Sequence, residues 1–269
     1  MHQAFPAGIR CTTLLSSVLY ETYAFIVRYL GEQLDLPIHL YTGRDVTEFV
    51  EGEAEMGFLC GLLYVHLART ASSPVELLAA PVLHGERYRN QALYFSDVIV
   101  RRESPYTRFE DLRGCTWAYN EPASHSGYNL VQYSLLQRGL TPKYFGSTLE
   151  SGSHLASLDL VLAGKADAAA LDSHLLDTLL ARRPELTQRL RVIEMLGPSS
   201  IPPLVTAKSL DPALKQRLRE VLLTMHNDST AAQVLHAGQI SRFVAVDDAR
   251  YDDIRAMFDL VQSGEAGRV

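Results

Sequence analysis

The chain has 269 residues and 47% hydrophobic content, enough to bury one large core or two medium ones. Its net charge of -6 and its dispersed basic residues argue against a nucleic-acid partner, because binding a phosphate backbone needs a concentrated basic face. No segment approaches the roughly 18 uninterrupted apolar residues of a membrane helix, and Cys11, Cys60 and Cys115 form neither a zinc knuckle nor a redox pair.

The first part of the chain alternates between strand patterns and helix patterns. Strands are predicted over 8–17, 37–43, 56–61 and 75–83. Helices are predicted over 45–55, capped by Asp45, over 62–70, and around an apolar stripe of Tyr23, Phe25, Ile26, Tyr29, Leu30 and Leu34. Alternation of this kind indicates an α/β layer with parallel strands.

The second part repeats the alternation after an unusually long extended stretch over 92–104. Strands are predicted over 115–120, 166–173 and 190–196, and helices over 109–114, 128–138, 153–164 and 174–183. The prolines of 197–207 favour a second extended segment. Two helices are then predicted over 212–228 and 251–264, and both are expected to pack on a lobe.

The two extended segments, Leu93–Val100 and Pro198–Thr206, bracket a complete α/β unit. We therefore predict two lobes joined by two crossovers, each lobe a mostly parallel sheet flanked by helices. The first lobe comprises 1–92 and 203–269, and the second comprises 93–202. Ligand sites in such folds lie at the carboxyl ends of strands and in the cleft between lobes.

Two helix starts in the second lobe have similar composition. Ser124, His125, Ser126 and Gly127 open one helix, and Ser151-Gly152-Ser153-His154 opens another. A helix N-terminus offers free N–H groups and about half a positive charge, so it favours an oxyanion without any lysine. Asp172 follows a strand, where its carboxylate is expected to point into the cleft.

Each of these residues also has a purely structural interpretation. A serine at a helix start is commonly a cap, and Asp172 can cap the helix that follows it. His154 alone is typical of a surface or core-edge position, and Tyr94 is typical of packing.

The motifs together resemble a known family. "FEDLRGCTWAYNEPASHSGYNLVQYSLLQRGL" followed by "SGSHLASLDLVLAGKADAAALDS" is similar to the phosphate, phosphite and phosphonate substrate-binding proteins of ABC transporters, and the resemblance covers nearly the whole chain. It implies a type 2 periplasmic-binding-protein fold. It also implies ligand contacts from Ser124, His125, Ser126, Gly127, Ser153, His154, Asp172 and Tyr94.

One position departs from the family pattern, because His125 stands where phosphonate binders commonly carry threonine. The exchange adds bulk and can place a positive charge near the anion. The expected function is non-catalytic capture of a small oxyanion or phosphonate for ABC-type uptake, with no cofactor and no metal. The implied partners are a small anionic ligand and the permease and ATPase subunits, and a monomer is expected.

Two other functions remain open. One is a cytoplasmic sensor or binding protein for another organic molecule, such as a thiamine-precursor pyrimidine, with a ring stacked on Tyr20, Tyr23, Tyr64, Tyr94 or Tyr119. The other is a serine hydrolase built from Ser126, His125 or His154, and Asp172. The N-terminus lacks the pattern of a secretory signal. A periplasmic location is therefore expected if an export signal has been removed, and a cytoplasmic one if the sequence is complete.

Overall fold

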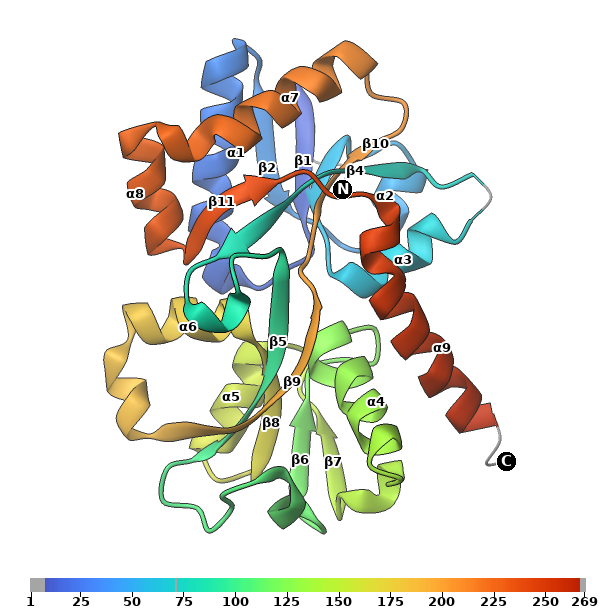
Figure 1. The fold of residues 1–269 in the computed structure, drawn as a ribbon, viewed down its shortest axis with the longest axis vertical. Helices are drawn as coiled ribbons and strands as arrows, with labels where there is room; N and C mark the ends of the chain where they lie inside the picture. The colour runs from blue at the N-terminus through green and yellow to red at the C-terminus, as the bar shows by residue number, and fades with distance from the viewer. Residues whose placement is uncertain (1–7, 71, 267–269) are drawn as a thin grey trace. The chain divides into compact units, whose positions relative to one another are not determined.

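The computed structural model describes residues 8–70 and 72–266 (Figure 1). They form two compact α/β units. One comprises residues up to Leu93 together with Ser200–Tyr251, and the other comprises Tyr94–Ser199 together with residues from Asp252 onward. The chain therefore passes between the units after Leu93, after Ser199 and after Tyr251. The lobe assignments predicted for 1–7, 71 and 267–269 lie outside the described residues.

The first unit is built on a sheet with the strand order β11-β4-β10-β3-β1-β2. Its strands are β1 (Ile9–Thr13), β2 (Ile38–Thr42), β3 (Met56–Phe58), β4 (Val75–Leu83), β10 (Leu204–Ala207) and β11 (Ile240–Val244). Its helices are α1 (Tyr20–Leu34), α2 (Thr47–Val50), α3 (Gly61–Ala68), α7 (Pro212–Thr224) and α8 (Ser229–Ala237). Strands β2, β1 and β3 run parallel, as expected from their connections.

The second unit is built on a sheet with the strand order β7-β6-β8-β5-β9. Its strands are β5 (Leu93–Arg101), β6 (Thr116–Tyr119), β7 (Ser147–Glu150), β8 (Ala168–Asp172) and β9 (Leu190–Ser200). Its helices are α4 (Leu130–Gln137), α5 (His154–Leu162), α6 (Ser173–Arg182) and α9 (Asp252–Ala266). The segment Phe109–Leu112, predicted as a short helix, is a 3-10 turn.

A buried aromatic cluster fixes one face of the second sheet. Trp117 and Phe145 stack with ring centroids 4.5 Å apart, and Phe109 contacts both rings. Leu130 and Val131 of α4 belong to the same core. Because α4 rests on this cluster, the turn that precedes α4 is held at the end of the sheet.

Two parts of the predicted architecture need correction. The sheets are mixed rather than mostly parallel, since β10 pairs antiparallel with β3 and β4, and β5 pairs antiparallel with β8. Parallel neighbours need a crossover connection, whereas β10 enters the first sheet directly from β9 of the other sheet, without a helical crossover from β3 or β4. The sequence prediction also missed β7, α8 and β11.

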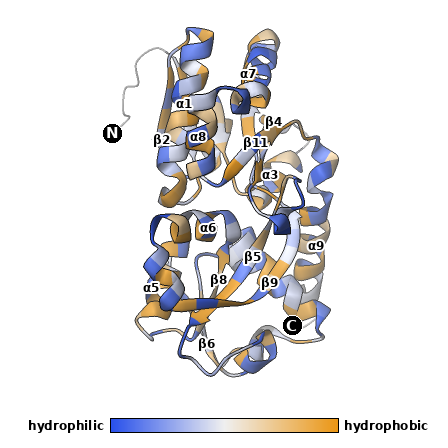
Figure 2. Cartoon of the chain, turned by 60° about the vertical axis from the view of Figure 1, so that its left-hand side comes forward, coloured by the Kyte–Doolittle hydropathy of each residue, from blue (hydrophilic) through white to orange (hydrophobic). Residues whose placement is uncertain are grey.

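The C-terminal helix differs from the predicted lobe assignment as well. Residues 252–266 belong to the second unit rather than the first. Helix α9 carries both hydrophilic and hydrophobic residues (Figure 2), and its Ile254 and Val261 are buried. The helix packs against α4, where Gly264 lies next to Leu136, so the burial of its apolar face places it in this unit.

Candidate functional site

Four segments of the second unit meet at one edge of its sheet. Strands β6, β7 and β8 run parallel, so the residues that follow β6 and β7 lie at the same edge as Asp172 at the end of β8. Strand β5 begins at this edge, because Ser96 pairs with Asp172 in an antiparallel register. The carboxyl edge of parallel strands is the usual place for a ligand in α/β folds.

The segment after β6 begins a helix, as predicted from the sequence. The Ser124 hydroxyl caps this start by accepting a hydrogen bond from the Gly127 N–H at 3.0 Å. The first turn, His125–Asn129, is π-helical and leads directly into α4. Turns of this type occur frequently at functional sites. The first N–H groups of a helix have no acceptor within the helix itself, so the N–H groups of His125 and Ser126 are the ones that this start can offer to a ligand.

Ser126 and His154 come together from two different segments. Ser126 Oγ lies 3.2 Å from His154 Nε2, and the ring tautomer decides which of the two groups donates. Burial lowers the pKa of His154 to about 4, although a backbone hydrogen bond with Ala170 opposes the shift. His154 is therefore neutral at neutral pH, and the pair offers an anion neutral hydrogen-bonding groups rather than a charge.

Gly127 allows this close approach because it has no side chain. A Cβ atom at this position would lie 1.8 Å from Asn120 Oδ1 and 3.1 Å from His154 Cε1. Asn120 is buried, and within residues 8–70 and 72–266 its Oδ1 has no hydrogen-bond partner. Sequence reasoning missed Asn120, although its place at the end of a predicted strand was a usable signal.

Ser153 and Asp172 both act as helix caps. Ser153 is exposed, and its hydroxyl accepts from the Ala156 N–H at 3.1 Å. Asp172 Oδ1 accepts from the N–H groups of His174 at 2.8 Å and Leu175 at 3.1 Å. These bonds match the structural interpretation of both residues, and neither bond tests a role in ligand binding.

The environment of Asp172 nevertheless favours its neutral form. Burial raises its pKa to about 7, the two helix N–H groups oppose this, and the charges of Asp97 and Asp177 raise it further. Its cross-strand neighbour Ser96 donates to the Ser126 carbonyl at 2.6 Å. Directly opposed residues project to the same face of a sheet, so Asp172 lies on the face that carries the turn.

The structure contradicts the positive charge considered for His125. The side chain is fully buried, and burial lowers its pKa to about 3, so the ring is neutral. Its Nε2 lies 2.8 Å from Ser199 Oγ and its Nδ1 lies 3.1 Å from Asn129 Nδ2. Both ring nitrogens are therefore occupied by protein groups. Tyr94 is buried beside this ring, with centroids 6.4 Å apart.

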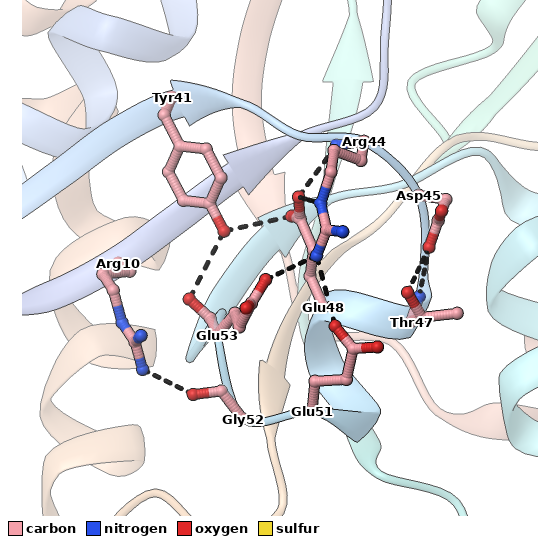
Figure 3. Close-up of polar contacts among 9 residues, drawn as sticks. All are labelled: Arg10, Tyr41, Arg44, Asp45, Thr47, Glu48, Glu51, Gly52 and Glu53. Carbon is pink, nitrogen blue, oxygen red and sulfur yellow. Dashed lines mark hydrogen bonds and ion pairs between the residues drawn. The ribbon is translucent and has the colours of Figure 1, made fainter. Parts of the chain in front are cut away.

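Arg44, which follows β2, does not offer an alternative anion site. Arg44 is paired with Glu53 at 2.6 Å and with Glu51 at 3.2 Å (Figure 3). The buried Glu48 accepts from the Arg44 N–H at 2.8 Å and from the Tyr41 hydroxyl at 3.0 Å. The Arg44 guanidinium is therefore already paired with nearby carboxylates.

The geometry does not complete a hydrolytic triad around Ser126. A triad needs a carboxylate that orients the histidine, and no carboxylate contacts His154 within the described residues. Asp172 Oδ1 caps α6 instead. In the same part of the chain no group of three His, Cys, Asp or Glu side chains can hold a metal ion.

The fold and the groups at the carboxyl edge of the second unit's sheet define an α/β substrate-binding protein of two units. A family model described as the periplasmic substrate-binding protein of phosphonate ABC transporters matches residues 12–251. The chain therefore belongs to this family, and the resemblance inferred from its motifs is confirmed. Across the described residues, no helix has the length and apolar character that a membrane crossing requires.

Solved structures share the fold at low sequence identity. A binding protein of an ABC phosphonate transporter from Pseudomonas aeruginosa is 22% identical, with a TM-score of 0.79 and coverage of 94% of this chain and 86% of that chain. PhnD1 from Prochlorococcus marinus, in complex with methylphosphonate, is 20% identical, with a TM-score of 0.82 and coverage of 94% and 98%. A Xanthomonas citri protein bound to ATP is 21% identical, with a TM-score of 0.70 and coverage of 95% and 98%.

Proposed function

We propose that this protein captures a small phosphonate or related oxyanion on the turn Ser124–Gly127 and His154, and releases it unchanged to an ABC transporter. The observation that carries the proposal is the contact between Ser126 and His154, which joins the two predicted helix starts. Family membership supports the ligand class, and PhnD1 binds methylphosphonate in its structure.

The ligand is held by neutral donors in this proposal. The N–H groups of His125 and Ser126 and the Ser126 hydroxyl supply hydrogen bonds, and the helix terminus supplies partial positive charge. A lost donor that leaves a buried group unpaired costs about 1–3 kcal/mol. Selectivity then depends on how many oxygen atoms the ligand presents to these donors, and on how well the positions of the oxygens match those of the donors.

Catalysis is not part of the proposed function. Ser126 and His154 form a serine–histidine pair, but the missing carboxylate partner leaves the histidine without the orientation that a general base needs. The family is one of solute-binding proteins, which supports the same conclusion. We propose that the protein acts in the periplasm as a monomer, with permease and ATPase subunits as its partners.

The pyrimidine-sensor alternative receives less support. Tyr23 is buried and stacks on Phe58 with centroids 3.9 Å apart, and Tyr64 is buried against Tyr251. Both rings are used in packing within the first unit. They are therefore unsuited to stack on a bound heterocycle.

The test is ligand binding by calorimetry and thermal shift, with methylphosphonate, phosphite, phosphate and sulfate as probes. A ligand present at 100 times its Kd adds about 2.7 kcal/mol to the free energy of unfolding. We expect methylphosphonate to stabilise the wild type, and the variant Ser126→Ala to weaken binding at least tenfold. Ser147→Ala is the matched control, because Ser147 lies at the opposite end of β7 and bonds Thr116 instead.

Two results would overturn the proposal. One is equal affinity of the wild type and Ser126→Ala for methylphosphonate. The other is turnover of a phosphonate or aryl ester that Ser126→Ala abolishes, which would establish a hydrolase.

A further inference from the structure

His125 belongs to a chain of hydrogen bonds in which His125, Asn129 and Ser199 are buried and Asp253 is partly buried. Asn129 Nδ2 lies 3.1 Å from His125 Nδ1, and His125 Nε2 lies 2.8 Å from Ser199 Oγ. Ser199 Oγ in turn donates to Asp253 Oδ2 at 3.2 Å. The four side chains come from three distant parts of the sequence, so only the folded unit assembles this chain of hydrogen bonds.

The positions of the hydrogen atoms in this chain of hydrogen bonds follow from which of its groups can donate and which can only accept. A carboxylate only accepts hydrogen bonds, so the single hydrogen of the Ser199 hydroxyl points to Asp253. Ser199 must then accept from His125, which places the imidazole hydrogen on Nε2. His125 Nδ1 is left as an acceptor, and the Asn129 amide nitrogen is a donor that matches it. Every bond in the chain therefore has one donor and one acceptor.

The Ser199–Asp253 end of this chain of hydrogen bonds lies where the polypeptide backbone passes between the units. Ser199 is the last residue of its unit before Ser200, and Asp253 follows the passage at Tyr251–Asp252. The residues just beyond these passages are bonded to each other as well. Ser200 Oγ donates to the Arg250 carbonyl at 2.6 Å, and the Tyr251 hydroxyl donates to the Ile201 carbonyl at 3.0 Å.

We propose that His125 is a positioning residue, whose Nε2–H tautomer is fixed by Ser199 and Asp253 and holds the turn Ser124–Gly127 in its binding geometry. This inference rests on the proposed function of that turn. It links the affinity of the site to the segment where the backbone leaves the unit, after Ser199, and to the segment where it returns, at Asp252. It also explains why a histidine stands here, since threonine has one hydroxyl and cannot bridge Asn129 and Ser199.

The burial of the ring supports a fixed neutral tautomer. His125 has no exposed surface, and its pKa is lowered to about 3. A buried donor that loses its partner is costly, so the two ring nitrogens cannot exchange roles unless Ser199 and Asn129 exchange theirs. The tautomer of His125 therefore reports directly on the donor and acceptor roles in this chain of hydrogen bonds.

The first experiment measures the tautomer by long-range ¹H–¹⁵N NMR of the ligand-free wild type at neutral pH. We expect the Nε2–H form for His125. In Asp253→Ala the Ser199 hydroxyl loses its acceptor and turns to His125, so we expect the Nδ1–H form or a mixture of the two. Asp253→Asn keeps an acceptor oxygen, and we expect it to restore the Nε2–H form.

The second experiment measures methylphosphonate affinity in the same variants. We expect about tenfold weaker binding for Asp253→Ala and near wild-type binding for Asp253→Asn. Tyr144→Phe is the control, because it removes buried hydrogen bonds to the Phe109 and Glu110 carbonyls before β7, at the opposite edge of the sheet. We expect this control to lower stability and leave the affinity unchanged.

The outcomes separate this inference from the proposed function. The inference is overturned by an Nδ1–H tautomer in the wild type, or by unchanged tautomer and affinity in Asp253→Ala. If the tautomers behave as expected but Ser126→Ala binds methylphosphonate as tightly as the wild type, the proposed function fails while the chain of hydrogen bonds stands.

Discussion

Asp172 combines two roles that a single carboxyl group rarely holds together, since it caps α6 while its environment favours the protonated form. Sequence reasoning selected it for its place after a strand, and both the cap and the burial follow from that place. Asn120, Ser96 and Ser199 were missed. Ser96 and Ser199 are isolated polar residues with no spacing pattern, and only the pairing of distant segments brings them to the turn.

The raised pKa of Asp172 predicts a defined pH dependence of stability. The pKa is about 7 in the folded chain against 3.8 for an ordinary aspartate, so between these values the folded chain holds a proton that the unfolded chain has released. The contribution of Asp172 to the free energy of unfolding therefore falls as pH rises from about 4 to about 7.

Asp172→Asn removes this dependence, because asparagine does not ionise and still caps the helix. In urea unfolding, we expect the stability of the variant relative to wild type to rise with pH across that window, by a few kcal/mol at most. Asp211→Asn makes the same exchange at the exposed start of α7 and serves as the control. A difference between Asp172→Asn and wild type that does not change with pH would contradict the prediction.

At the scale of elements, helix starts were easier to predict than strands. The patterns that preceded α4, α5 and α6 contain good capping residues, and each start is observed. Strand β7 was missed because all four of its residues are exposed and show no apolar alternation. The π-helical first turn before α4 has no sequence signature, since tertiary packing decides it.

Ser153 allows the contribution of a cap to the site to be measured. Ser153→Ala removes the acceptor for the Ala156 N–H at the start of the helix that carries His154. We expect a loss of about 1 kcal/mol in the free energy of unfolding, measured by urea denaturation. Ser153→Asn keeps a capping oxygen and is expected to recover most of the loss. Equal stability of the alanine variant and wild type would show that the cap contributes nothing.

At the scale of the whole molecule, the path of the backbone between the two units determines the architecture more than the order of its helices and strands does. The division after Leu93 and the return near Ser200 lie close to the predicted crossovers. The third passage, after Tyr251, had no counterpart in the prediction. An amphipathic helix can cover either unit, and the sequence pattern of α9 does not state which apolar surface it covers.

The placement of α9 predicts its behaviour in hydrogen exchange. Its buried Ile254 and Val261 pack within the second unit, so α9 is expected to open together with α4. We expect the amides of these two helices to share one protection level, and Leu136→Ala to lower both. Protection of α9 that follows the helices of the first unit instead would contradict this placement.

The sequence by itself determined the α/β class, the family, most helix starts and the segments 124–127 and 151–154, because local capping chemistry and hydrophobic period are properties of neighbouring residues. The tertiary structure alone decided the strand directions, the unit to which α9 belongs, the contact of Ser126 with His154 and the inward turn of His125. Those features depend on which distant segments share a sheet edge or a buried hydrogen bond, and a local pattern carries no record of that choice.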